Sequence, residues 1–136
     1  MKKIFFSFLL GALLNTTLFA NMATANANAL LTAMYLESNG YYIKDISGRH
    51  LRTGHYRTYN RYLYSGNCYV IASVGDNNVR DLDIKVWDRY WNYIGTDSDS
   101  SKTAVVKICP NRSGTYRFRT KMYRGSGYFR MIIGWK

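Results

Sequence analysis

Proline, cysteine and histidine are scarce in this sequence, whose 136 residues include one proline, two cysteines and two histidines. Disordered chains are poor in aromatic residues, whereas 16% of these residues are aromatic, so we expect a folded chain with its own core. The cysteines form no Cys-x-x-Cys motif and have no zinc-spaced histidine pair beside them, which argues against redox catalysis and zinc binding. His50 and His55 accompany no nucleophile elbow or His-Glu-x-x-His motif. The length of 136 residues predicts a single domain, and the absent motifs predict that it is not an enzyme.

Residues 1–20 have the pattern of a secretory signal peptide. Two lysines are followed by an apolar stretch over residues 4–14 and by small and polar residues that end in Ala20. A transmembrane helix needs about 20 apolar residues. Asn15-Thr16-Thr17 interrupts this stretch too early, so we expect no transmembrane segment in the mature chain. Cleavage after Ala20, or at Ala-x-Ala sites up to residue 29, would place the protein in a bacterial periplasm or outside the cell; the alternative is an uncleaved anchor.

Export determines the oxidation state that we expect for the two cysteines. In an oxidising compartment Cys68 and Cys109 are expected to form a disulfide. The bridge would close a loop of about 40 residues and stabilise the fold by about 3–4 kcal/mol. Two buried free thiols are the alternative.

The charges are distributed unevenly along the chain. The formal net charge is +11, yet six of the eight acidic residues lie within residues 76–99. Residues 100–136 contain nine basic residues and no acidic ones. Such a field attracts anionic partners such as lipid headgroups, lipopolysaccharide or teichoic acids. Solubility of a small exported protein is the alternative explanation.

Apolar periodicity predicts a short helix followed by strands. Residues 25–36 have helical spacing and are followed by Asn39-Gly40, a common end of a helix. Beyond them apolar and polar residues alternate with period two in the runs 82–86, 116–122 and 129–135, and 67–74 and 103–108 are short apolar or β-branched runs. Short alternating strands between Gly, Asn, Asp and Ser turns indicate an antiparallel β-sandwich. We therefore expect a helix and connecting segment at 25–52 and a sandwich at 53–136, with Trp87 and Trp135 in structural positions.

Several segments of residues 53–136 resemble the bacterial pre-peptidase C-terminal domain family. They are Gly66–Ala72, the strand Asp81-Leu82-Asp83-Ile84-Lys85-Val86-Trp87-Asp88, and the turn that runs from Pro110 through Ser113-Gly114-Thr115-Tyr116. The resemblance implies a mostly β, jelly-roll-like sandwich of the kind usually appended to secreted proteases. Only the leader and the short helix precede it here, so we expect attachment or recognition rather than a protease appendage.

Some relatives in that family bind calcium, and the acidic segment of this chain supplies oxygen ligands of the type that Ca²⁺ prefers. The candidate ligands are Asp76, Asp81, Asp83, Asp97 and Asp99. Their spacing does not match an EF-hand. Neutralisation by Arg80, Lys85 and Arg89 is the alternative, so the expected cofactor is either none or Ca²⁺.

Basic and aromatic residues alternate near the C-terminus. Arg117, Arg119 and Lys121 are expected on the solvent face of a strand whose other face is buried, so that neutralising all three should barely affect folding. With Arg124 and Arg130 they are the candidate anion-binding residues, since arginine matches phosphate, sulfate and carboxylate groups. The alternative is that tyrosines fill the sandwich edges while arginines only solvate the outer face.

These observations predict an exported, non-enzymatic binding module. Its partner would be an anionic envelope component, a glycan or a protein. A calcium-stabilised structural module of a larger envelope assembly is the alternative. Nucleic acid is not expected as a native partner of an exported protein.

Overall fold

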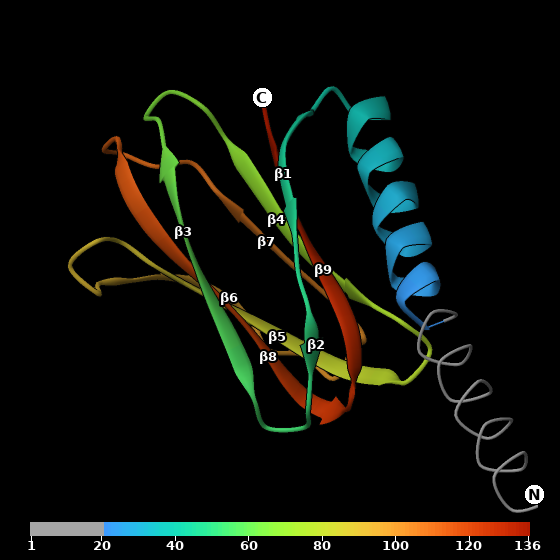
Figure 1. The fold of residues 1–136 in the computed structure, drawn as a ribbon. Coiled ribbons are helices and arrows are strands. Elements are labelled where there is room, and N and C mark those ends of the chain that lie inside the picture. The colour runs from blue at the N-terminus through green and yellow to red at the C-terminus, as the bar shows by residue number, and fades with distance from the viewer. Residues whose placement is uncertain (1–20) are drawn as a thin grey trace, which may run out of the picture.

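The computed structural model describes residues 21–136, which form one helix and nine strands (Figure 1). The predicted leader, residues 1–20, lies outside the described residues. Residues 21–38 are helical. The strands are β1 (Tyr42–Ser47), β2 (His50–Leu51), β3 (Tyr56–Leu63), β4 (Tyr69–Gly75), β5 (Val79–Trp87), β6 (Tyr93–Asp97), β7 (Thr103–Ile108), β8 (Gly114–Gly125) and β9 (Gly127–Trp135). No helix within residues 21–136 combines the length and the apolar character needed to cross a membrane.

The strands form two antiparallel sheets that face each other, as the sequence predicts. One sheet has the order β1-β9-β4-β7, with β2 also paired to β9, and the other has the order β3-β8-β5-β6. Between them lies the main core, because every second side chain of a strand points to the same face. Its largest fully buried members include Phe118, Phe129, Leu63, Ile71, Met122 and Ile133. Trp135 packs against this core, as predicted.

The helix packs on the outer face of the five-stranded sheet, over β4 and β9 (Figure 1). Its buried stripe begins with the small side chains of Ala25, Ala29 and Ala33 and ends with Leu36. The helix ends at Ser38, where Gly40 adopts a positive φ of 86° and the Leu36 carbonyl of the last turn accepts the N–H of Tyr41 at 3.0 Å. The helix is longer than the predicted 25–36, and a signal cleavage site as late as residue 29 would cut within it.

Residues 42–51, which sequence patterns assign to a connecting segment, are part of the sandwich. β1 and β2 both pair with β9, so the sandwich begins at residue 42 rather than at residue 53. β1 escapes prediction because it is an edge strand whose register shifts between Ile43 and Asp45, which breaks its apolar alternation.

The predicted disulfide between Cys68 and Cys109 is present, with an S–S distance of 2.04 Å. Its position follows from strand pairing. Tyr69 and Ile108 are register partners at the ends of β4 and β7, so the adjoining cysteines meet just beyond that pair.

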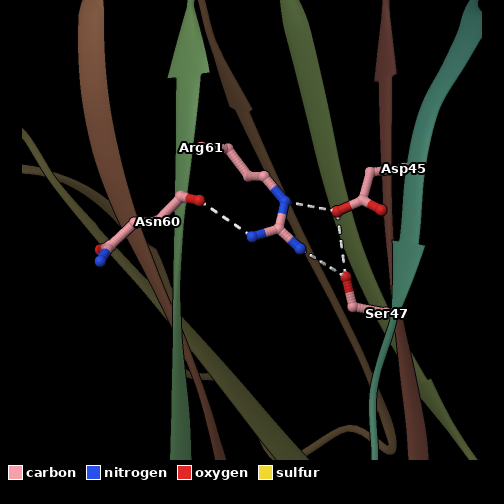
Figure 2. A network of polar contacts seen from close by, with 4 residues as sticks. All are labelled: Asp45, Ser47, Asn60 and Arg61. Carbon is pink, nitrogen blue, oxygen red and sulfur yellow. Dashed lines mark hydrogen bonds and ion pairs between the residues drawn. The ribbon is translucent and has the colours of Figure 1, made fainter.

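An ion pair joins the two sheets along one open side of the sandwich (Figure 2). Arg61 of β3 donates from Nε to the Asp45 carboxylate of β1 at 2.5 Å and from Nη2 to the Ser47 hydroxyl at 3.0 Å. The Ser47 hydroxyl donates in turn to Asp45 at 3.0 Å. Edge strands of opposite sheets are thus linked where the core between them would otherwise meet solvent.

Candidate functional site

β8 runs through the middle of the four-stranded sheet and carries the predicted cationic residues. Tyr116, Phe118, Thr120 and Met122 are buried on its inner face. Arg117, Arg119 and Lys121 alternate with them and are half-buried on the outer face. We call these three residues the cationic strip.

Aromatic residues from the neighbouring strands flank the cationic strip. Pairing places Tyr56 of β3 opposite Lys121 and Trp87 of β5 opposite Arg117. The Arg119 guanidinium lies between their rings, 4.1 Å from the centroid of Tyr56 and 4.8 Å from that of Trp87. Its Nε is buried and has no hydrogen-bond acceptor among residues 21–136. The two ring faces therefore provide the main local stabilisation of this charge.

The loop between β5 and β6 adds Trp91 to the same face. Trp91 is non-glycine yet has a positive φ of 65°, a conformation that costs about 1–3 kcal/mol and clusters at functional sites. Its ring packs edge to face against that of Trp87, with 5.7 Å between the ring centroids. The Arg117 guanidinium lies 4.1 Å from the Trp91 centroid. Arg117 also donates to the carbonyl of Arg89 at 2.7 Å. The strained backbone thus holds an indole over the end of the cationic strip.

Asp88 fixes the loop that presents Trp91. One of its carboxylate oxygens accepts the N–H groups of Tyr90 at 2.8 Å and Asn92 at 2.9 Å, and the other accepts the Asn92 side-chain amide at 2.9 Å. Desolvation alone would raise the pKa of Asp88, but the hydrogen bonds from Asn92 and Tyr90 outweigh it and lower that pKa. Asp88 therefore remains ionised at neutral pH and keeps its hydrogen bonds to Tyr90 and Asn92.

The outer face of the four-stranded sheet is hollowed beside the cationic strip. The hollow has a volume of about 630 Å³ and is lined by Tyr56, Asp83, Tyr93, Arg119, Lys121 and Tyr123, among others. Tyr56, Tyr93 and Tyr123 are each more than half exposed. An open hollow with exposed rings and fixed cations can stack on flat apolar surfaces and attract anions at the same time.

Sequence patterns alone missed most of the aromatic part of this site. Trp87 is expected in a purely structural position, yet it lies on the outer face against Arg119. The sequence patterns make no prediction for Trp91 or Tyr93. The signal that could have found them is the short spacing of Trp87, Trp91 and Tyr93 around a turn, which returns all three to one end of the sheet.

The five predicted anion-binding residues do not all come together. Arg124 lies at the far end of β8, with its Nε 3.9 Å from the Asp81 carboxylate. Arg130 belongs to β9 in the other sheet, where its Nε donates to Asn26 of the helix at 2.8 Å. Arg130 is therefore not part of the cationic strip, because the two sheets point their outer faces in opposite directions.

The predicted calcium ligands are not assembled either. Within residues 21–136, no group of three or more His, Cys, Asp or Glu side chains is arranged to hold a metal ion. Asp76 instead accepts the backbone N–H groups of Asn78 and Tyr128, both at 2.9 Å. Asp97 accepts the N–H groups of Asp99 at 3.3 Å and Val105 at 2.7 Å. In the described chain the carboxylates of Asp76 and Asp97 therefore bind backbone N–H groups.

Asp81 and Asp83 remain as an adjoining pair of carboxylates. Asp81 is 3% exposed, and each residue has one buried oxygen without a hydrogen-bond partner in the described chain. Burial, together with the charge of Asp81, raises the pKa of Asp83 above its ordinary value. Asp83 lines the hollow together with Arg119 and Lys121, so its carboxylate offsets part of the positive charge of this face.

Comparison with known proteins finds the fold but no family. No family model matches the chain, and no curated protein matches its sequence. The crystal structure of Aeromonas hydrophila PliG, described as a periplasmic inhibitor of g-type lysozyme, matches with a TM-score of 0.53 and 11% identity over 72% of this chain and 90% of that one. The pre-peptidase C-terminal domain of a Bacillus anthracis collagenase matches with a TM-score of 0.54 and 14% identity over 67% and 89%.

At these identities the likeness shows a shared fold and nothing finer. The resemblance to the pre-peptidase C-terminal domain therefore holds at the level of the fold. Neither structure is described as a catalytic domain, and the disulfide is compatible with an exported protein.

Proposed function

We propose that this protein is an exported, non-enzymatic binding module and that the outer face of its four-stranded sheet binds an anionic polysaccharide of the cell envelope. One observation carries the proposal. Three cations stand in line on the central strand, and aromatic rings flank them on both sides.

The spacing of the cationic strip suits a polymer better than a small anion. Alternate residues of a strand are about 6.5–7 Å apart, so Arg117 and Lys121 lie about 13 Å apart along β8. A chain with repeated negative charges can meet several of these cations at once, which raises its affinity in a salt-dependent way. A single small anion can meet only one or two of them.

The aromatic residues favour a sugar polymer over a purely ionic partner. Tyr and Trp combine a flat apolar face with a polar group, and Tyr56, Trp91, Tyr93 and Tyr123 each leave about half of their surface exposed. Arginines held against rings are fixed in place, so binding costs them little conformational entropy. The same fold serves as a periplasmic inhibitor in PliG, which supports a binding role without identifying the partner.

The test compares two triple variants with the same change in net charge. R117Q/R119Q/K121Q removes the cationic strip, whereas K44Q/K102Q/K107Q removes three exposed lysines from elsewhere on the described chain. We expect the strip variant to bind heparin, used as an anionic polysaccharide probe, at least tenfold more weakly than wild type, and the control to lose less than about threefold. Neutral dextran, which has no charge, should bind both variants much more weakly than heparin binds wild type. Equal losses in the two variants would show that only net charge matters and would contradict the proposal.

A second variant separates stacking from charge. W91A/Y93A keeps every basic residue of the cationic strip and removes two exposed rings. We expect its heparin affinity to fall most, relative to wild type, at high salt, where ionic attraction is screened and ring contacts carry more of the binding. An affinity equal to wild type at all salt concentrations would remove the aromatic residues from the site.

A further inference from the structure

A second concave surface lies on the opposite side of the molecule, between the helix and β7. Its floor is formed by Val70 and Ala72 of β4, one wall by Leu31 and Tyr35 of the helix, and the other wall by Val105 of β7. Its volume is about 610 Å³, within the range of small-molecule sites. We call it the helix groove.

The helix groove exists because the helix covers only part of its sheet. The helix packs on the β4 and β9 residues Val70, Val74 and Ile132 through its small alanines. Val105 and Lys107 are the register partners of Ala72 and Val70 on the same outer face, but the helix does not reach β7. Val105 therefore remains 42% exposed beside an apolar floor.

The charges around the helix groove are of one sign. Lys107 and Lys136 line it, and no acidic residue of the described chain does so. Lys136 is held in place: its Nζ donates to the Asn39 carbonyl at 3.3 Å and lies 4.4 Å from the centroid of the Tyr41 ring. Lys107 makes no ion pair within residues 21–136 and is exposed. An apolar floor with an unpaired cation at its edge complements a ligand that has an apolar body and an anionic head.

We propose that the helix groove binds a single-chain anionic amphiphile of the class of long-chain carboxylates. The alkyl chain packs between the exposed side chains of Leu31 and Tyr35 on one wall and Val105 on the other, above the buried floor, and the carboxylate meets Lys107. The apolar lining gains affinity by removing methylene groups from water, and the lysine selects the sign of the head group. This site is separate from the polysaccharide face, because the two lie on outer faces of different sheets.

The first test measures binding of octanoate, decanoate and dodecanoate to the full chain by calorimetry, below their micelle concentrations. If each methylene loses about half of its exposed surface, affinity should rise roughly fourfold for each two added methylenes. Dodecanoate should bind at least threefold more tightly than dodecanol or dodecyltrimethylammonium, and K107Q should abolish that preference. Affinity independent of chain length, or equal affinity for the cationic amphiphile, would overturn the proposal.

Matched variants place the ligand. Leu31 and Leu30 are adjacent on the helix and 64% and 60% exposed, but only Leu31 lines the groove; Val105 and Ile46 are 42% and 46% exposed, and only Val105 lines it. We expect L31S and V105E to weaken dodecanoate binding at least fivefold, and L30S and I46E to change it less than twofold. Because Leu31 and Leu30 are largely exposed, both serine variants should fold even if V105E does not.

Two outcomes would refute the proposal independently of the polysaccharide face. Equal losses in L31S and L30S would show that dodecanoate adsorbs without a site. A concentration-dependent dimer that L31S disrupts, in sedimentation without ligand, would show that a second copy of the chain covers the groove. The R117Q/R119Q/K121Q variant should bind dodecanoate as wild type does, so failure of one proposal leaves the other standing.

Discussion

The outer faces of the two sheets differ although both sheets are antiparallel and share one core. β4 of the five-stranded sheet is buried along all seven residues, because the core covers one side and the helix the other. β8 of the four-stranded sheet alternates between buried apolar and half-buried cationic side chains. The comparison shows that the outward side chains of a sheet stay accessible to solvent where they are charged and no helix crosses them.

The difference also separates stability from recognition. The helix-covered sheet holds the disulfide and the second apolar cluster. The uncovered sheet holds the strained Trp91 and the arginines between rings. We therefore expect the largest losses of unfolding free energy from changes on the first sheet and the largest losses of heparin affinity from changes on the second.

The disulfide should give the largest effect on stability. The C68A/C109A variant should lose about 4 kcal/mol of unfolding free energy, because the bridge spans 41 residues. Urea denaturation measures the loss. Hydrogen exchange should rise more at β7, which the bridge fastens to β4, than at β6 in the other sheet. A uniform rise across both sheets would contradict this local role.

A charge under the helix should come next. Ala29 is 3% exposed against Val70, Val74 and Ile132, so A29K buries a charge without a partner and should cost at least about 3 kcal/mol. Ala27 is exposed on the same helix, and A27K should change stability by less than about 0.5 kcal/mol. Urea denaturation of A29K and A27K measures the two losses of unfolding free energy. Similar losses would mean that the helix does not contribute its alanine face to the fold.

The cationic strip should have an intermediate effect. From sequence, neutralising its three charges is expected to leave folding nearly unchanged. In the structure, Arg117 binds two carbonyls and Arg119 lies between two rings. We therefore expect R117Q/R119Q/K121Q to lose about 2 kcal/mol of unfolding free energy while remaining folded. The K44Q/K102Q/K107Q control should lose less than about 0.5 kcal/mol by the same measurement.

The smallest effect concerns Asp83 and depends on pH. Burial and the charge of Asp81 raise the pKa of Asp83, so the folded state binds the proton more tightly than the unfolded state does. The stability that this proton contributes is complete below the ordinary pKa of about 4 and is lost as the pH rises through the folded-state pKa. D83N should therefore melt slightly above wild type at pH 7 and lose that advantage below pH 4.

Thermal denaturation at the two pH values tests the sign. Asp99 lies exposed in the loop after β6, and D99N serves as the control with the same change in charge. A D83N variant that melts below wild type at pH 7, while D99N does not, would show that the ionised carboxylate stabilises the fold.

Much of the fold could be predicted because local patterns and burial agree. Alternation in residues 116–122 correctly assigned the two faces of β8, and the pairing of Cys68 with Cys109 followed from export and from their number. β1 could not be predicted, since an edge strand with a register shift lacks a clear alternation. The role of Asp76 could not be predicted either, because spacing alone cannot tell that its carboxylate accepts two backbone N–H groups.

The binding face was predictable only in part. The members of the cationic strip are two residues apart in sequence, so within one strand they had to share a face. Its aromatic partners come from β3, β5 and the loop before β6, and pairing alone decides that Tyr56 and Trp87 enclose Arg119. The sequence by itself determined the β-sandwich, the disulfide and the charged face, because these depend on period-two burial and on the amount of each residue type. Only the tertiary structure decided which rings meet which arginines and where the helix stops short of β7, because both depend on contacts between segments far apart in the chain.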